Sequence, residues 1–133
     1  MAEKLTVESV RSAIWKLLGE YGWDFVYNIR GECDYVPNEL NDAGCGVGEV
    51  VKLHGFDPNE LDPGNIGGIN REQHFTYLRI DEATDSHVVF YLREFQELQD
   101  SGIAWGECYE QTELSYSNFL TRLSSERQLA RRW

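Results

Sequence analysis

The sequence predicts an α-dominated α+β domain of 133 residues. Apolar residues recur at steps of three and four over residues 7–21 and 88–123, which is the period of helices with one buried face. Residues 23–29 and 33–36 are instead dense in aromatic and β-branched side chains, which favours strands. The expected order is an N-terminal helix, a small antiparallel hairpin, a short helix and a C-terminal αα-hairpin.

The N-terminal helix is predicted from its apolar stripe and its ends. Thr6 is a suitable N-cap, and Glu8 places a negative charge in the first turn. Gly19 and Gly22 are expected to bring the helix to its end. The predicted hairpin follows, with turn-forming residues 28–31 between its two strands. Residues 75–80 are a candidate third strand.

The short helix is predicted from three alternating glycines around Cys45 and a valine-rich face that runs to His54. A thiol at a helix start has its thiolate favoured by the helix dipole, and a histidine can act as a base. Because these two residues are nine positions apart on a helix, a tight packing seam is the favoured interpretation. The glycine spacing matches neither the dinucleotide fingerprint nor a P-loop.

The C-terminal αα-hairpin turns at residues 95–106. One stripe ends near Leu98, and Gly102 can end that helix in the left-handed conformation. A second stripe begins at Trp105 and runs to Leu123. Two helices packed along these stripes form an αα-hairpin.

Three polar residues and one tryptophan at this corner are the main candidate contacts. Gln96 and Gln99 can bond buried loop backbone, Asp100 can accept from free N–H groups of the following helix, and Trp105 fills the corner. Polar groups inside a packed corner can also face a ligand pocket. If a small-molecule site exists, these residues and Cys45 are expected to form it.

The charge is −11 and unevenly distributed. Residues 1–121 hold 8 basic and 22 acidic side chains and form the predicted acidic globular domain, whereas residues 122–133 hold 4 arginines and 1 glutamate and form a predicted basic helical tail. An acidic body disfavours direct nucleic-acid binding and favours a basic partner surface. The tail either frays, folds back on the body, or presents Trp133 as a partner anchor.

No metal, cofactor or catalytic residue is predicted. Three cysteines without CxxC spacing favour reduced, buried thiols over zinc. Glu94 and Glu97 share a helix face but have no histidine beside them. Without a signal-peptide pattern or a long apolar run, the protein is expected in the cytoplasm and away from membranes, as a monomer or a homodimer.

Several motifs together resemble a family of small uncharacterised proteins from actinobacteria and their bacteriophages. The resemblance covers roughly residues 23–112 and rests on Tyr35-Val36, on Cys45-Gly46-Val47-Gly48 followed by His54-Gly55, and on Gln96-x-x-Gln99-Asp100-x-Gly102-x-x-Trp105-Gly106. Gly46 stands where a larger apolar residue is usual, and the basic tail is an addition. The resemblance implies an origin rather than a mechanism.

The predicted function is that of a small non-catalytic interaction or regulatory protein, encoded by a phage and binding a basic surface of a host protein. One alternative is an acidic nucleic-acid mimic that inhibits a DNA-binding protein. Another is a small-molecule-binding domain or thiol enzyme that uses the glycine and cysteine segment.

Overall fold

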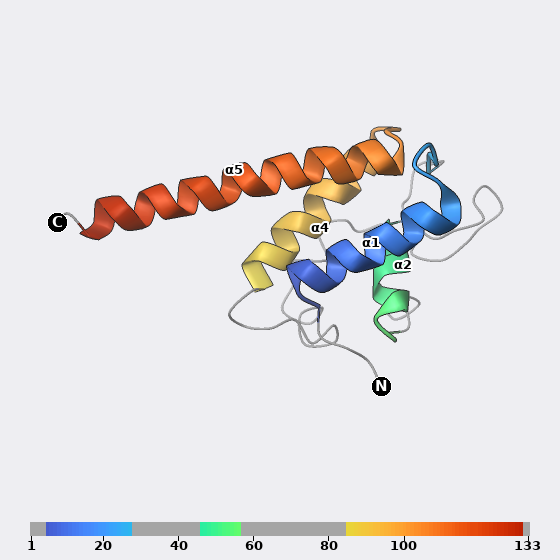
Figure 1. Cartoon of the computed structure of the whole chain (residues 1–133), viewed down its shortest axis with the longest axis horizontal. Coiled ribbons are helices and arrows are strands. Elements are labelled where there is room, and N and C mark those ends of the chain that lie inside the picture. Colours follow the sequence, from blue (N-terminus) through green and yellow to red (C-terminus); the bar gives the residue numbers. More distant parts are fainter. Residues whose placement is uncertain (1–4, 28–45, 57–84, 132–133) are drawn as a thin grey trace.

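A computed structural model describes residues 5–27, 46–56 and 85–131. Within these residues the chain forms four helices: α1 (Val7–Tyr21), α2 (Gly46–Leu53), α4 (Asp85–Asp100) and α5 (Trp105–Arg131). Figure 1 shows that α1, α2, α4 and the first half of α5 gather into one body, while the second half of α5 extends away from it. None of the described helices is both long and apolar enough to cross a bilayer.

One hydrophobic core joins all four helices. Trp105, Tyr91 and Phe95 are among the largest side chains that are fully buried. The buried positions of α1 are those of the predicted stripe, so this helix turns its apolar face to the core: Val7, Val10, Ala13, Ile14, Leu17 and Leu18. Burial of these side chains is the main force that holds the helices together.

The helix ends follow the expected local chemistry. The Thr6 side chain accepts from the Ser9 N–H at 3.0 Å, and the Ser9 hydroxyl accepts from the Thr6 N–H at 2.9 Å, forming a reciprocal capping box. At the corner between α4 and α5, Gly102 has a φ of +84°, a left-handed conformation that residues with a Cβ resist. The expected N-terminal helix, short helix and αα-hairpin are therefore present.

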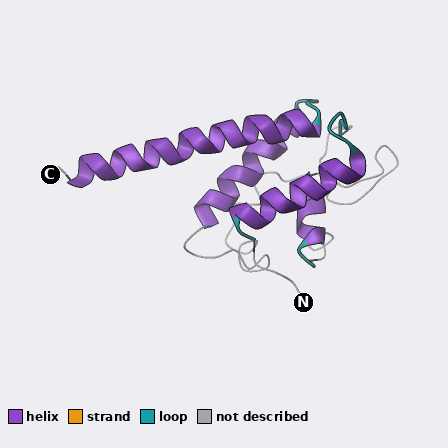
Figure 2. Ribbon diagram, in the orientation of Figure 1, coloured by secondary structure: helices purple, strands orange, loops and turns teal. Residues whose placement is uncertain are grey.

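The predicted β-hairpin and the α+β class are wrong. Figure 2 shows only helices and loops in the described residues, and Trp23–Tyr27 form a turn followed by irregular chain. The carbonyls of Trp23 and Phe25 accept from the first N–H groups of α5 rather than from a second strand. The aromatic density of this segment thus serves packing against helices. The remaining hairpin residues, 28–36, and the candidate third strand, 75–80, lie outside the described residues.

The long helix α5 continues without a break through the predicted boundary at residue 121 to Arg131. Among α5 residues 105–127, whose burial is described, the last buried one is Tyr116, and residues 124–127 are exposed. The basic segment is therefore an extension of a core helix. The division into an acidic domain and a basic tail stays a prediction from charge.

Candidate interaction surface

Three aromatic side chains form a cluster on the surface between α1 and α5. We define this aromatic cluster as Trp15, Trp23 and Tyr109. The two tryptophans are 52% and 41% exposed, and all three ring pairs meet edge to face, with centroids 5.4–6.2 Å apart. The indole N–H of Trp15 donates to the Tyr109 hydroxyl at 3.0 Å. Rings in such contact form a preformed platform rather than independent side chains.

The turn that carries Trp23 is fixed by the start of α5. The Trp105 N–H donates to the Phe25 carbonyl at 2.8 Å, and the Gly106 N–H donates to the Trp23 carbonyl at 2.9 Å. These are two of the N–H groups that a helix start leaves without intrahelical partners. A Cβ on Gly106 would lie 2.6 Å from the Trp23 ring and 2.8 Å from its carbonyl oxygen. The glycine therefore permits the close approach that positions the tryptophan.

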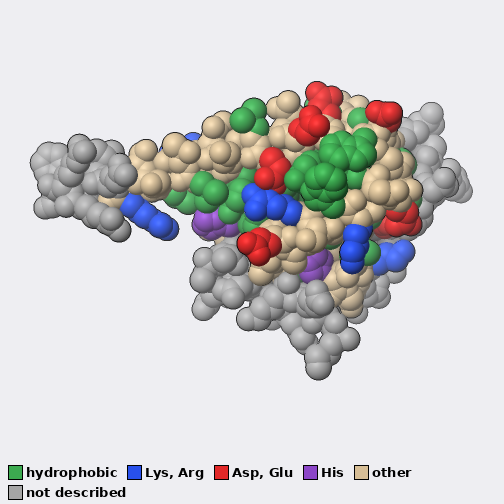
Figure 3. Space-filling view, viewed as in Figure 1, with side chains coloured by type: hydrophobic (Ala, Val, Ile, Leu, Met, Phe, Trp, Pro, Cys, Tyr) green, Lys and Arg blue, Asp and Glu red, His purple; other side chains and the backbone are tan. Residues whose placement is uncertain are grey.

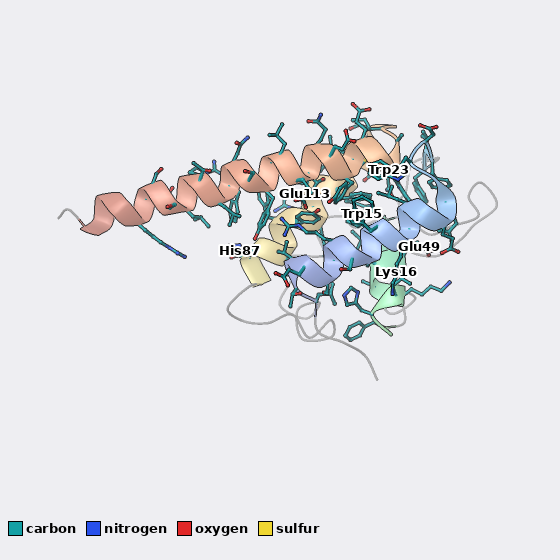
Figure 4. The ribbon with its side chains drawn as sticks, in the orientation of Figure 1. Trp15, Lys16, Trp23, Glu49, His87 and Glu113 are labelled. Carbon is teal, nitrogen blue, oxygen red and sulfur yellow. The ribbon has the colours of Figure 1, made fainter. Side chains whose placement is uncertain are left out.

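Charged side chains surround the aromatic cluster. Figure 3 shows carboxylates on several sides of the hydrophobic side chains that gather over α1 and the start of α5. Asp24 follows the tryptophan of the turn, Glu110 follows the tyrosine, and Glu113 lies one helical turn beyond it. Figure 4 shows Glu113 pointing into the space between α1 and α5, close to the cluster. Lys16 is a nearby cation on α1.

An ion-pair network borders the cluster. The Arg11 Nε donates to a Glu113 carboxylate oxygen at 2.6 Å, and the Tyr91 hydroxyl donates to the same oxygen. The arginine also lies over the rings of Tyr91 and Tyr116, 5.8 Å and 5.3 Å from their centroids. The hydrogen bond that Arg11 donates to Glu113 raises the Arg11 pKa, and burial raises the pKa of Tyr91. Arg11 and Glu113 thus form an ion pair beside the cluster.

The sequence-predicted corner residues meet at the start of α2. The Gln99 side-chain oxygen accepts from the Gly46 N–H at 2.7 Å and from the Trp105 indole N–H at 3.1 Å. The Gln96 side-chain oxygen accepts from the Val47 N–H at 3.4 Å. The two buried glutamines thus bond backbone, as expected. The backbone belongs to the first turn of α2, however, and not to the corner loop.

Asp100 is placed differently from the expectation. Its Oδ1 accepts from the side-chain amides of Gln99 at 2.9 Å and Gln96 at 3.5 Å, and Oδ2 is buried without a hydrogen-bond partner. Burial raises the pKa of this carboxyl. Within the described residues the first N–H groups of α5 donate instead to the turn of residues 23–25. Asp100 therefore orients the two glutamines.

Both ring nitrogens of His54 form hydrogen bonds within the helical body. Its Nδ1 lies 2.8 Å from the Val50 carbonyl, which can only accept, so this nitrogen carries the proton and donates. Its Nε2 lies 2.8 Å from the Ser9 hydroxyl, which belongs to the capping box of α1. The ring thus joins the end of α2 to the start of α1. The partner considered for it, Cys45, lies outside the described residues, as does Trp133.

The described residues offer no group of three or more metal-binding side chains. The one cysteine among them, Cys108, is fully buried and donates its thiol to the Ile103 carbonyl at 3.2 Å. Burial raises its thiol pKa to about 12, so it is not a nucleophile at neutral pH.

These features define a class of protein by geometry: a small helical domain with a cluster of three aromatic rings on its surface. Comparison with known protein families, curated proteins and solved structures finds no match to this chain.

The aromatic cluster was missed by the sequence analysis. One signal was available for Trp15, which lies off the apolar stripe of its helix and is therefore a large aromatic residue on the polar face. No signal was available for the meeting of Trp15 with Tyr109, 94 positions along the chain. Trp23 was assigned to a strand that is not formed.

Proposed function

We propose that the protein is a non-catalytic interaction module that binds a lysine- or arginine-rich segment of a partner protein on its aromatic cluster. The observation that supports this most directly is the exposure of two tryptophans, 52% and 41%, on rings that are held in place. Large exposed aromatic residues are rare on surfaces that face only water, and tryptophan is enriched among residues that dominate binding energy.

The charge around the cluster selects the partner chemistry. A cation above a tryptophan face gains about 0.5–2 kcal/mol, and more when it is desolvated. Asp24 and Glu110 are exposed and directly follow two residues of the cluster in the chain, whereas Arg11 is already paired with Glu113. A basic segment therefore finds both ring faces and free carboxylates there. The motif resemblance adds the expectation that the partner is a protein of an actinobacterial host.

A titration with defined peptides tests this proposal. The full chain is titrated with an arginine-rich peptide and with a glutamine-substituted peptide of the same length, and tryptophan fluorescence is followed. We expect binding of the basic peptide alone, weakened about tenfold or more by Trp15→Ser combined with Trp23→Ser. Leu114→Ser is the control, because Leu114 is 59% exposed on α5. Equal affinity of the control and the double variant contradicts the proposal.

Capture from an actinobacterial lysate then identifies the partner. The wild-type chain, the double tryptophan variant and the control are compared after nuclease treatment. Elution follows a salt gradient, because screening weakens exposed charge contacts. A protein that is retained by the wild type and the control, and lost with the double variant, fits the proposal. A captured protein that competing DNA releases, and that the tryptophan variants still bind, favours the nucleic-acid mimic instead.

A further inference from the structure

The second half of α5 projects from the body of the protein. Phe119 still reaches the body, because its ring stacks on Phe90 with centroids 4.4 Å apart. Residues 124–127 are all exposed. Figure 1 shows this part of the helix extending past the ends of α1 and α4. We call residues 117–131 the projecting segment.

The composition of the projecting segment does not support a solitary helix. Isolated helices shorter than about 12–15 residues are marginal in water even when rich in alanine. Serine, threonine and asparagine are weaker helix formers than alanine or leucine. The segment holds these weaker residues at five positions: Ser117, Asn118, Thr121, Ser124 and Ser125. As the continuation of α5, this segment is stabilised further by a packing partner along one face.

An apolar stripe runs from the body onto the projecting segment. Tyr116, Phe119, Leu120 and Leu123 lie at spacings of three and four on one helix face, as in helices that pair along their length. Tyr116 is buried, whereas Leu120 is 41% exposed. The stripe therefore begins inside the core, shares a pocket with Val7 and His87 at Leu120, and ends at the partly exposed Leu123.

The charge of the projecting segment indicates what packs against its apolar stripe. Residues 122–133 hold 4 of the 12 basic side chains, whereas the preceding residues hold 22 of the 23 acidic ones. Because α5 is continuous to Arg131, Arg122 and Arg127 are carried away from the described part of their own acidic body. The acidic body of a second copy of the chain would give these arginines a surface of opposite charge.

We propose that the protein forms a two-fold homodimer in which the two projecting segments pack antiparallel. The same stripe then faces itself, as a two-fold interface requires. A segment of 15 residues spans about 22 Å, so the arginine-rich end of each α5 reaches the acidic body of the other copy near Glu113. The apolar stripe ends at Leu123, about 21 Å along α5 from the aromatic cluster, whereas the arginines of the second copy reach Glu113, which borders that cluster.

Sedimentation velocity on the full chain tests the dimer. We expect the mass to rise from one chain toward two with increasing concentration. Leu120→Glu combined with Leu123→Glu is expected to weaken dimerisation about tenfold or more. The control is Asn118→Glu combined with Ser125→Glu, which adds the same charge to the opposite face of the same segment. Near-ultraviolet circular dichroism from buried Trp105 verifies that each variant keeps its body folded.

A second pair of variants separates charge from apolar contact. Arg122→Glu combined with Arg127→Glu is expected to weaken the dimer, and salt is expected to weaken the wild type but not this variant. Lys16→Glu combined with Lys52→Glu makes the same change in net charge away from the projecting segment and is expected to leave the dimer intact. A monomer at every concentration overturns the proposal, as does a control that dissociates as readily as its matched variant.

Discussion

Trp105 donates its indole N–H to the Gln99 side-chain oxygen at 3.1 Å, and the same oxygen accepts the Gly46 N–H at 2.7 Å. One amide oxygen thus binds the starts of two helices, α2 and α5, from a third, α4. All of these groups are buried, so none exchanges readily with water. Gln99 and Trp105, which lie on either side of the corner between α4 and α5, therefore help to connect three of the described helices.

Replacement of Gln99 by leucine is expected to destabilise the protein strongly. The change keeps the side-chain size but leaves the Gly46 N–H and the Trp105 indole N–H buried without an acceptor. Each such group costs about 1–3 kcal/mol, so we expect the two together to lower the free energy of unfolding by about 2–6 kcal/mol. Urea denaturation measures it. Gln111→Leu, at an exposed position of α5, is the control and is expected to change stability by less than about 0.5 kcal/mol.

Gly46→Ala and Gly19→Ala are expected to change stability in opposite directions. A Cβ at Gly46 would lie 2.5 Å from the Phe95 ring, so the core must shift at a cost of about 1–3 kcal/mol. A Cβ at Gly19 meets nothing within 4 Å in α1, where alanine is favoured over glycine by about 0.8–1 kcal/mol. Thermal unfolding of both variants tests this contrast, and destabilisation by both would contradict it.

Gly106→Ala is expected to displace Trp23 and disrupt the aromatic cluster. The new Cβ would lie 2.8 Å from the Trp23 backbone oxygen, and a backbone atom cannot simply rotate away. We expect altered tryptophan fluorescence and a loss of peptide binding about as large as that caused by Trp23→Ser. If Gly106→Ala leaves both fluorescence and binding unchanged, the turn does not position the cluster.

Stability is expected to fall at alkaline pH through Cys108. Its thiol pKa is raised to about 12 in the folded chain, compared with 9.0 ordinarily. Above pH 9 the unfolded thiol loses its proton while the folded thiol keeps it, so the contribution to stability is complete below pH 9 and is lost as pH rises toward 12. The slope is at most about 1.4 kcal/mol per pH unit. Urea denaturation from neutral to alkaline pH should show a shallower slope in Cys108→Ala, and equal slopes would contradict this cause.

The helices were predictable because their signals are local. The stripe of α1, its cap at Thr6 and the left-handed Gly102 are each encoded within a few residues. The hairpin prediction failed because aromatic density does not distinguish a strand from a turn packed on a helix end. The carbonyls of Trp23 and Phe25 instead accept hydrogen bonds from two N–H groups at the start of α5.

The candidate site was predictable only in part. Gln96, Gln99 and Trp105 were predictable because they lie within one short segment around a glycine that ends a helix. That they bond the start of α2 depends on pairs 49 and 53 positions apart. Such pairs form only when whole helices pack together, and a single sequence does not show which helices will pack.

The hydrogen bonds at the start of α2 can form only late in synthesis, because their acceptors are made after their donors. A ribosome makes the chain from the N-terminus at about 5–20 residues per second. Gly46 and Val47 are made about 50 positions before Gln96 and Gln99, which accept from their N–H groups. During that interval α1 and α2 present their valines and leucines without the α4–α5 pair that buries them. The apolar faces of these two helices therefore lack their α4–α5 packing partners until the last third of the chain has been made.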